Sequence, residues 1–454
     1  MLLRKAYQFK LKPDGASCRK LAQFCGCTRF VYNKGLVWNK ESYEKDKNFK
    51  LSYAGLCALL PGWKKELPWL GKCHSQVLQQ AMKDLMRSFE NFWEGRTDFP
   101  KFHKKFKTQD SFRYPQGFKI NEVRKQVFLP MIGWVNYRRS RYIQGKPRNI
   151  TVSRKADGWY FSIRTEREIG NPVHPKSGVE VGIDVGVVHT VTLSDDTPPV
   201  EPINAFRTKQ KKLAHAQRKL KRMTKFGKNW RKLQKKIALL HKHIADCRRD
   251  HLRKAAGNIC KNHAVVYREA LKIKNMAASA KGTAEEPGKN VSQKSGLNKA
   301  ILDQGWAMFF AMLDEYMKEW GGEVYAVPPA YTSQTCPHCN HVSAASRPAQ
   351  ALFHCENCGY EGNADRVAAV NLLRRGQRLR ACGELRSTAE APVRRPSRKR
   401  RVVQQQEPIE EIAEQHNAAS QLSRESPPFR TERMSTEGAP PSSQDEGFRT
   451  LMNL

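Results

Sequence analysis

The sequence predicts a multi-domain α/β protein, and three patterns support this fold class. Strand-like segments at 3–11 and 110–168 flank a helical block, strands and helices alternate from residue 179, and two cysteine pairs lie between 336 and 358. The 454 residues suffice for about three domains at roughly 150 residues each. We therefore expect a β domain with a helical insertion, followed by an α/β region with a cysteine site.

The β domain is predicted from two separated parts of the chain. Alternating residues from Leu3 to Leu11 place apolar side chains on one strand face. Segments 149–154 and 159–164 are joined by Asp157-Gly158, a hairpin signal. The intervening residues show helical spacing, with apolar positions at Leu21, Phe24, Cys25, Val31, Leu78, Met82, Leu85, Met86 and Phe89.

The second half reads as buried strands separated by helices. We expect adjoining strands at 179–186 and 188–193, and further strands at 264–267 and 323–327. Between them, 206–262 predicts a helical hairpin that bends at Gly227. Its apolar seam follows a narrow 4-3-4 spacing. The residues of this seam are Leu233, Ile237, Leu240 and Ile244. We also expect a loop at 277–297 and an amphipathic helix at 298–320.

Charge indicates a polyanionic partner. The formal net charge is +38 with a pI near 9.9, and nucleic acid is the commonest polyanion. The stretch from Arg207 to Lys254 holds 19 Lys/Arg and two acids, so its helices could follow a phosphate backbone. The alternative is a merely solvated helix face. Residues 381–454 carry no net charge and are rich in Pro, Ser and Gln, which predicts a disordered tail over 380–454.

No segment suggests a membrane or an export route. No run approaches 18 apolar residues, and the first ten residues lack the apolar stretch of a signal peptide. Eight of the twelve cysteines are scattered rather than arranged as a disulfide framework. We therefore expect a reduced, cytoplasmic protein.

The strongest local signal is a cysteine site at 330–359. Cys336 and Cys339 form one C-x2-C pair, and Cys355 and Cys358 form another after 15 residues. This spacing is typical of two knuckles that present four thiolates to a structural Zn²⁺. The alternatives are four incidental buried cysteines, or a redox pair that would leave the other pair unexplained. His338 lies inside the first knuckle and is expected to be a bystander.

Three acids point to a second metal site. Asp184 lies in an apolar strand, Glu269 ends another, and Asp365 precedes a helix at 366–374. Singly, each has a structural explanation: a turn residue, a solvated strand end, and a helix N-cap. Together they resemble the carboxylates with which ribonuclease-H-like nucleases hold two Mg²⁺ ions. Clustered acids in so basic a chain also need a cation to avoid repelling phosphate.

Several motifs then resemble one family, the TnpB (OrfB-type) transposon-encoded proteins related to type V CRISPR effectors. The resemblance covers roughly residues 1–375 and is strongest from 179 to 373. The segment around the first cysteine pair is the most specific. The motifs are Gly182-Ile183-Asp184-Val185-Gly186, Arg268-Glu269-Ala270-Leu271, Ser295-Gly296-Leu297-Asn298-Lys299, Asp303-Gln304-Gly305-Trp306, Tyr331 through Cys339, and Asn363-Ala364-Asp365 leading into Ala368 through Leu372.

This resemblance implies a domain plan and an activity. It implies a β-barrel wedge domain (1–15 and 110–170) with a helical recognition insert (16–109). A RuvC-like nuclease domain (176–329 and 360–378), interrupted by the zinc knuckle (330–359), would follow. The family's activity is RNA-guided cleavage of target DNA beside a short adjacent motif, with a guide RNA derived from the transposon end.

Carried over residue by residue, the family's catalytic acids fall on Asp184, Glu269 and Asp365. The chain departs from the family pattern at two neighbours. Ala270 stands where Asp or Asn usually follows the glutamate, and Val367 stands where Asn is common. Neither change removes a metal ligand, but both could reduce activity.

Two other functions remain open. A non-catalytic regulator of transposition or a guided repressor would bind nucleic acid without cutting it, and Ala270 and Val367 motivate this alternative. A strand-transferring transposase fits less well, because no separate end-recognition module stands out. The aromatic stretches 99–107 and 159–161 could stack bases or could belong to the core.

Overall fold

The computed structural model describes residues 1–105, 107–283 and 285–388. All of these residues belong to one compact unit. Of the predicted tail, 389–454 lies outside the described residues. Its first residues, 380–388, are part of the folded unit: Arg380 pairs with Glu180 and Glu323, and Thr388 N donates to Val324 O.

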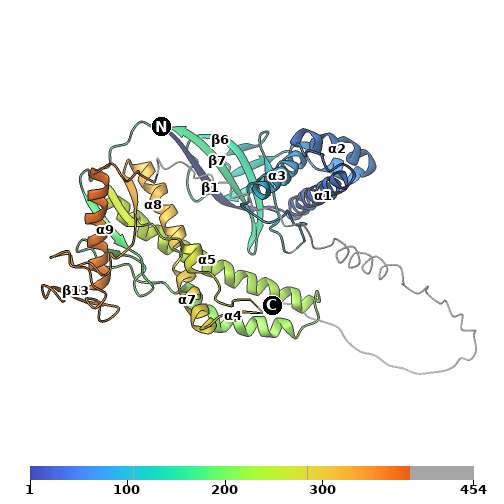
Figure 1. The fold of residues 1–454 in the computed structure, drawn as a ribbon. Helices are drawn as coiled ribbons and strands as arrows, with labels where there is room; N and C mark the ends of the chain where they lie inside the picture. Colours follow the sequence, from blue (N-terminus) through green and yellow to red (C-terminus); the bar gives the residue numbers. More distant parts are fainter. Residues whose placement is uncertain (106, 284, 389–454) are drawn as a thin grey trace, which may run out of the picture. The chain divides into compact units, whose positions relative to one another are not determined.

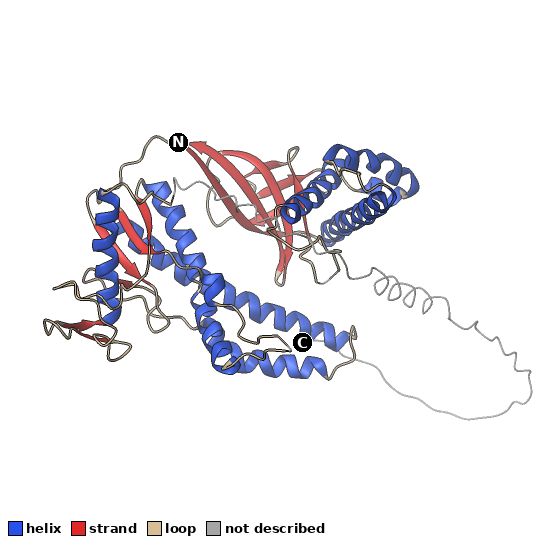
Figure 2. Ribbon diagram, in the orientation of Figure 1, coloured by secondary structure: helices blue, strands red, loops and turns tan. Residues whose placement is uncertain are grey.

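The first half is built on a seven-stranded antiparallel sheet in the order β2-β6-β7-β1-β5-β4-β3, which curves strongly in Figure 2. The N-terminal strand lies in the middle, paired with β7 from Leu2↔Glu168 onward and with β5 on its other side. Segments predicted to form one domain therefore meet directly. The strands are β1 (Leu2–Lys12), β2 (Ser111–Tyr114), β3 (Lys119–Asn121), β4 (Gln126–Leu129), β5 (Gly133–Arg138), β6 (Lys146–Lys155) and β7 (Gly158–Glu168).

The helical insert packs on this sheet and shares its core. Phe24 lies with its ring centroid 5.4 Å from that of Phe112 on β2, and both are buried. Trp159 and Phe161 are buried too, so these two rings of the 159–161 stretch are core residues and not a stacking surface. The insert comprises α1 (Gly15–Lys45), α2 (Tyr53–Glu66), the 3-10 turn η1 (Pro68–Lys72) and α3 (Ser75–Trp93).

The second half is built on a four-stranded sheet in the order β11-β10-β8-β9. Three strands run parallel, and the short β9 is antiparallel to β8. The strand predicted at 188–193 is thus confirmed in place, but only its last two residues form β9. The strands are β8 (Glu180–Asp184), β9 (Thr192–Leu193), β10 (Val265–Glu269) and β11 (Glu323–Val327).

Helices cover both faces of this sheet. Val266 packs with α5 and α8 in one cluster, whereas its neighbours Val265 and Tyr267 pack with α9 in another. Because side chains alternate along a strand, these clusters lie on opposite faces. Figure 1 shows α9 and α8 on either side of the strands. The helices are α4 (Ala205–Lys221), α5 (Lys228–Asn262), α6 (Ile273–Met276), α7 (Val291–Gln304), α8 (Trp306–Trp320) and α9 (Ala364–Ala381).

Two predicted elements differ from the structure. The helix expected at 298–320 is two helices, because Gly305 has a φ of +74° and separates α7 from α8. Since α7 begins at Val291, the loop predicted at 277–297 is shorter. The hairpin is confirmed, with Ile237, Leu233 and Leu240 packed against α4. Across the described ranges, no helix combines the length and apolarity needed to cross a bilayer.

Candidate functional site

Asp184 and Glu269 lie at the same edge of the second sheet. Asp184 is the last residue of β8, and Glu269 is the last residue of β10. The two strands run parallel in a register that pairs Val265 with Glu180 and Arg268 with Ile183. One further step along this register brings Glu269 opposite Asp184. The sequence predicts Asp184 inside a strand over 179–186 and Glu269 at a strand end, whereas in the structure both acids end their strands.

Asp365 reaches this edge from α9. A glycine at 182 allows the helix to approach β8 closely, because a Cβ there would lie 2.1 Å from Ala369 O and 2.7 Å from Leu373 N. The Asp365 carboxylate faces the loop after β8, with Oδ2 4.0 Å from the position of a Cβ on Gly186. The structure thus brings Asp365 beside the segment that follows Asp184.

Asp365 is not the N-cap that a single-residue analysis suggests. Asn363 caps α9, and its Oδ1 accepts hydrogen bonds from the backbone N–H groups of Asp365 and Arg366. Asp365 therefore lies in the first turn with its carboxylate directed elsewhere. The capping function belongs to the neighbour, which leaves the acid free for another role.

The electrostatics of the three acids are those of a crowded carboxylate site. Burial, and after it the charge of Asp365, raises the pKa of Asp184 to about 7. Burial and the charge of Asp184 raise the pKa of Glu269 to about 8. Each acid thus destabilises ionisation of the next. A bound divalent cation would reverse this repulsion, which is the chemistry expected of a metal site.

The sequence analysis missed one residue here, Arg347. Its Nη2 lies 3.5 Å from Asp365 Oδ1, and its charge lowers the pKa of Asp184. Arg347 comes from the segment between the two cysteine pairs and donates to Gln350 O at 2.7 Å. An arginine 18 positions before the acid, in an irregular segment, leaves no periodic pattern by which the sequence could reveal it.

The four predicted zinc ligands come together. Cys336 Sγ lies 3.6 Å from Cys358 Sγ, and Cys339 Sγ lies 3.6 Å from Cys355 Sγ. All four sulfur atoms lie within 4.8 Å of one another. Zinc–sulfur bonds of about 2.3 Å in a tetrahedron place sulfur atoms about 3.8 Å apart, so these residues fit Zn²⁺. The hairpin of β12 (Leu352–His354) and β13 (Glu361–Asn363) flanks the second pair.

The thiolates and the carboxylates differ in how tightly they cluster. Among the residues that the structure describes, only the four cysteines form a group of three or more ligand side chains with all donor atoms within 4.8 Å. The three acids are spread more widely. This spacing does not suit a single ion bound by all three.

Of the two departures from the family pattern, Val367 has a structural explanation, and the side chain of Ala270 has none. Val367 is buried with Cys336, Phe353 and Cys355, so it belongs to the contact between α9 and the knuckle. Ala270 contributes its backbone N–H, which donates to Val327 O at 2.8 Å. An apolar residue at 367 therefore fits the site that the fold gives it.

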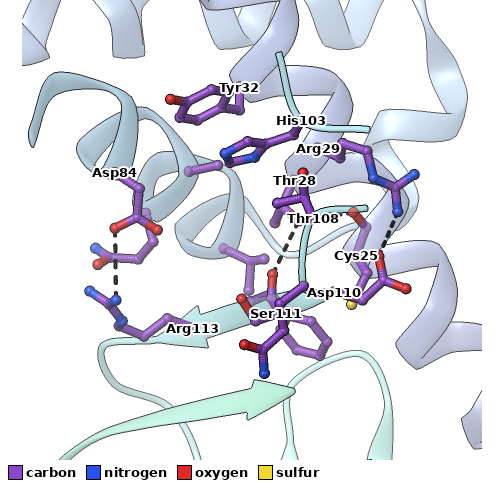
Figure 3. A pocket seen from close by; sticks show the side chains of 15 residues that line it. Cys25, Thr28, Arg29, Tyr32, Asp84, His103, Thr108, Asp110, Ser111 and Arg113 are labelled. Atoms are coloured by element: carbon purple, nitrogen blue, oxygen red, sulfur yellow. Dashed lines mark hydrogen bonds and ion pairs between the residues drawn. The ribbon is translucent and has the colours of Figure 1, made fainter. Parts of the chain in front are cut away.

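A separate polar cavity of about 70 Å³ lies between α1, α3 and β2. Figure 3 shows that its charged groups are paired: Arg29 with Asp110 at 2.8 Å, and Arg113 with Asp84 at 3.7 Å. The His103 and Tyr32 rings stack at 3.7 Å. This volume holds a few water molecules, and none of the three acids lines the cavity.

Comparison with known proteins gives the class. Three family profiles match: "Helix-turn-helix domain" at 1–48, "Probable transposase" at 160–280 and "Cas12f1-like, TNB domain" at 306–372. These profiles indicate a transposase-related protein with a Cas12f1-like TNB domain. Over 1–48 the structure contains a strand and a single 31-residue helix, β1 and α1.

Relatives then give the family. "Putative RNA-guided DNA endonuclease InsQ" of Escherichia coli (strain K12) is 44% identical, over 84% of this chain and 94% of the relative. "Putative RNA-guided DNA endonuclease" of Streptomyces pristinaespiralis is 29% identical, over 89% of this chain and 96% of the relative. The chain belongs to the TnpB (OrfB-type) family of transposon-encoded proteins, as its motifs predict. A Cas12f1–sgRNA–target DNA complex matches with a TM-score of 0.48 and 13% identity, over 82% of this chain and 98% of that one.

Proposed function

We propose that this protein is an RNA-guided, Mg²⁺-dependent DNA endonuclease, encoded by a transposon, that cleaves DNA next to a short target-adjacent motif. One observation carries the proposal. Asp184, Glu269 and Asp365 converge from β8, β10 and α9, and the pKa values of the first two are raised by burial and by a neighbouring acid. The names of the full-length relatives support the guided activity.

The architecture supports a ribonuclease-H-like (RuvC) nuclease domain. The sheet has three parallel strands and one antiparallel strand. Two neighbouring parallel strands each end in an acid, and a helix adds the third acid. The cysteine knuckle is inserted between β11 and α9. The curled seven-stranded sheet corresponds to the wedge domain, and α1–α3 correspond to the recognition insert.

Asp184, Glu269 and Asp365 would hold two Mg²⁺ ions. Magnesium, when bound, supplies an activated water molecule and neutralises charge at the scissile phosphate. The protein's own residues bind and orient. Arg347 lies beside Asp365, where its guanidinium can bind two oxygens of a phosphate in bidentate fashion.

Zn²⁺ has a structural role in this proposal. All four knuckle positions are cysteines, so a bound Zn²⁺ would have no coordination site left for substrate. The knuckle shares a small core with α9 through Ala364 and Val367. Bound zinc would therefore hold the first turn of α9, and with it Asp365, against the sheet.

The basic surface supports guide RNA and target DNA as partners. The formal charge of +38 gives long-range attraction to polyanions. Most cations of the α4–α5 hairpin are exposed, including Lys211, Lys219, Lys228 and Lys235. Such a surface neutralises phosphates, and binding through it should weaken as salt is raised.

The test is cleavage by an isosteric variant. Asp184→Asn keeps the side-chain volume and removes the charge, and we expect at least about a hundredfold slower cleavage of guide-matched DNA with Mg²⁺. Guide RNA affinity should be unchanged. The matched control is Asp196→Asn, an exposed acid in the segment after β9 that pairs with Arg366 at the surface.

If Asp184→Asn cuts as fast as the parent, the assigned site is wrong. If the parent binds guide and target but cuts at no Mg²⁺ or Mn²⁺ concentration, the alternative of a non-catalytic regulator holds. Joined transposon products would instead indicate strand transfer.

A further inference from the structure

The turn between α4 and α5 carries an exposed aromatic residue in a strained backbone conformation. Phe226 is 52% exposed and has a φ of +68°, a left-handed conformation that is rare for bulky residues. The next residue, Gly227, is the N-cap of α5 and has an ordinary φ of −62°. The fold thus maintains a phenylalanine, and not a glycine, at the disfavoured position.

This aromatic residue forms a small surface platform. Its ring centroid lies 5.3 Å from that of Trp230, at an interplanar angle of 61°. Lys225 Nζ lies 5.4 Å from the Phe226 centroid. The core of the hairpin lies elsewhere, around Leu213 and Ile237. Phe226 therefore lies outside the core of the hairpin.

The platform is surrounded by cations. Residues 221–236 contain eight Lys/Arg and no acid, and all eight are exposed. Among the described residues, none of the eight forms a salt bridge. A hollow on α4 lined by His215, Arg218, Lys219 and Arg222 continues the basic surface.

We propose that the α4–α5 tip, defined as residues 221–236, is a stacking site for an unpaired nucleobase. Phe226 and Trp230 offer ring faces to the base, and the flanking cations hold the neighbouring phosphates. A strand with exposed bases satisfies both groups at once. A continuous duplex does not, because its base faces are already stacked. The ligand is single-stranded nucleic acid, and RNA and DNA share this chemistry.

The test measures binding of the full-length chain to single-stranded 12-mers of RNA and of DNA. Each is compared with an abasic strand of the same length and phosphate number. Phe226→Leu should weaken binding of the base-containing strand about tenfold and leave the abasic strand unchanged. Phe226→Tyr should retain binding. The strand type with the larger loss identifies the natural ligand.

Salt dependence separates stacking from charge. Phe226→Leu should leave the slope of log affinity against log salt unchanged, whereas Lys225→Gln with Lys228→Gln should make it shallower by about 1.4. The matched control is Tyr43→Leu on α1. Tyr43 is 50% exposed with Lys47 Nζ 4.9 Å from its ring centroid, but Glu41 and Glu44 lie beside it in sequence. This control should bind as the parent does.

An equal loss of abasic and base-containing binding in Phe226→Leu would overturn the proposal, and so would no loss at all. Binding is measured without added Mg²⁺, so the result does not depend on cleavage. Failure of the proposed endonuclease activity would leave this inference standing, and the reverse also holds. Circular dichroism of each variant checks that α4 and α5 remain folded.

Discussion

Arg347 is a cation beside the acids that alters the chemistry expected of them. It faces Asp365 at 3.5 Å and lowers the pKa of Asp184, against the effects of burial and of Asp365. In a metal-free site it is the nearby cation that partly offsets carboxylate repulsion. At a phosphodiester it would become an anion-binding group.

We predict that Arg347→Gln shifts the pH profile of cleavage upward. Removing the guanidinium raises the pKa of Asp184 further, so the carboxylate ionises at higher pH and the rising limb moves to alkaline values. The measurement is the cleavage rate from pH 6 to 9. The control is Arg366→Gln. Arg366 directly follows Asp365 but is exposed and pairs with Asp196, so this variant should leave the pH profile unchanged. An unshifted profile in Arg347→Gln would exclude this role.

The raised pKa values of Asp184 and Glu269 also predict how stability depends on pH. Between about pH 4 and 8 the folded, metal-free protein binds more protons at these groups than the unfolded chain does. Stability from these groups is therefore lost as pH rises through that window. We expect the melting temperature without Mg²⁺ to fall by about 5 °C between pH 6 and pH 8.5.

Mg²⁺ should restore most of that loss at pH 8.5, because an ion that binds the folded state stabilises it. The double variant Asp184→Asn/Glu269→Gln serves as the control for other titrating groups. It should show a smaller pH dependence and no response to Mg²⁺. A parent protein that melts at the same temperature with and without Mg²⁺ at pH 8.5 would contradict the metal assignment.

At the scale of elements, close packing of α9 on the sheet assembles the site. Gly182 on β8 faces Ala369 and Leu373 of α9, and Gly376 of α9 faces the ring of Tyr267 on β10. Neither contact leaves space for a methyl group. Glycine in the first motif therefore has a steric function, which the sequence motif alone does not disclose.

We predict that Gly182→Ala destabilises the protein by about 1–3 kcal/mol or more, because the new Cβ would lie 2.1 Å from a backbone oxygen of α9. The cleavage rate should fall by more than the loss of folded protein explains, since α9 carries Asp365. Thermal unfolding and single-turnover cleavage are the measurements. Gly257→Ala in α5 is the matched control: its Cβ meets nothing within 4 Å, so we expect a neutral or slightly stabilising change.

Contacts between helices explain the Asp303-Gln304-Gly305-Trp306 motif. The buried Asp303 carboxylate accepts from Phe206 N at 3.0 Å and pairs with Arg248. It thereby joins the end of α7 to the start of α4 and to α5. Gln304 accepts from Thr190 Oγ1 at 2.8 Å. The motif is a structural anchor for the basic hairpin.

At the scale of the whole molecule, the cysteine knuckle is connected to the candidate active site. Arg347 lies between the cysteine pairs, and Asp365 follows the second pair by seven residues. If Zn²⁺ binds here as proposed, its loss would leave the four cysteines to a small core around Phe353 and Val367, which is too small to hold the knuckle alone. Both Arg347 and Asp365 depend on that segment.

We therefore predict that the parent protein binds one zinc ion per chain. Cys336→Ser should lose this zinc and cleave DNA at least about tenfold more slowly. Elemental analysis and cleavage assays are the measurements, with guide RNA affinity as a check on the rest of the fold. Cys382→Ser, at an exposed thiol just beyond α9, is the control and should keep both zinc and activity. A fully active, zinc-free Cys336→Ser protein would refute the proposed link.

The sequence by itself determined the features that depend on local periodicity and spacing. Alternation predicted β1 and the β6–β7 hairpin, the 4-3-4 seam predicted the α4–α5 hairpin, and C-x2-C spacing predicted the cluster of four cysteines. Motif resemblance identified the family, since such motifs need no three-dimensional context.

Only the tertiary structure decided which distant residues meet. Sequence spacing says nothing of Arg347, whose position depends on an irregular segment folded around the cysteine pairs, nor of Asn363 replacing Asp365 as the helix cap. The pKa values of Asp184 and Glu269 likewise arise from burial and from charges far away along the chain. Long-range packing sets these properties, because both electrostatic repulsion and desolvation depend on separation in space.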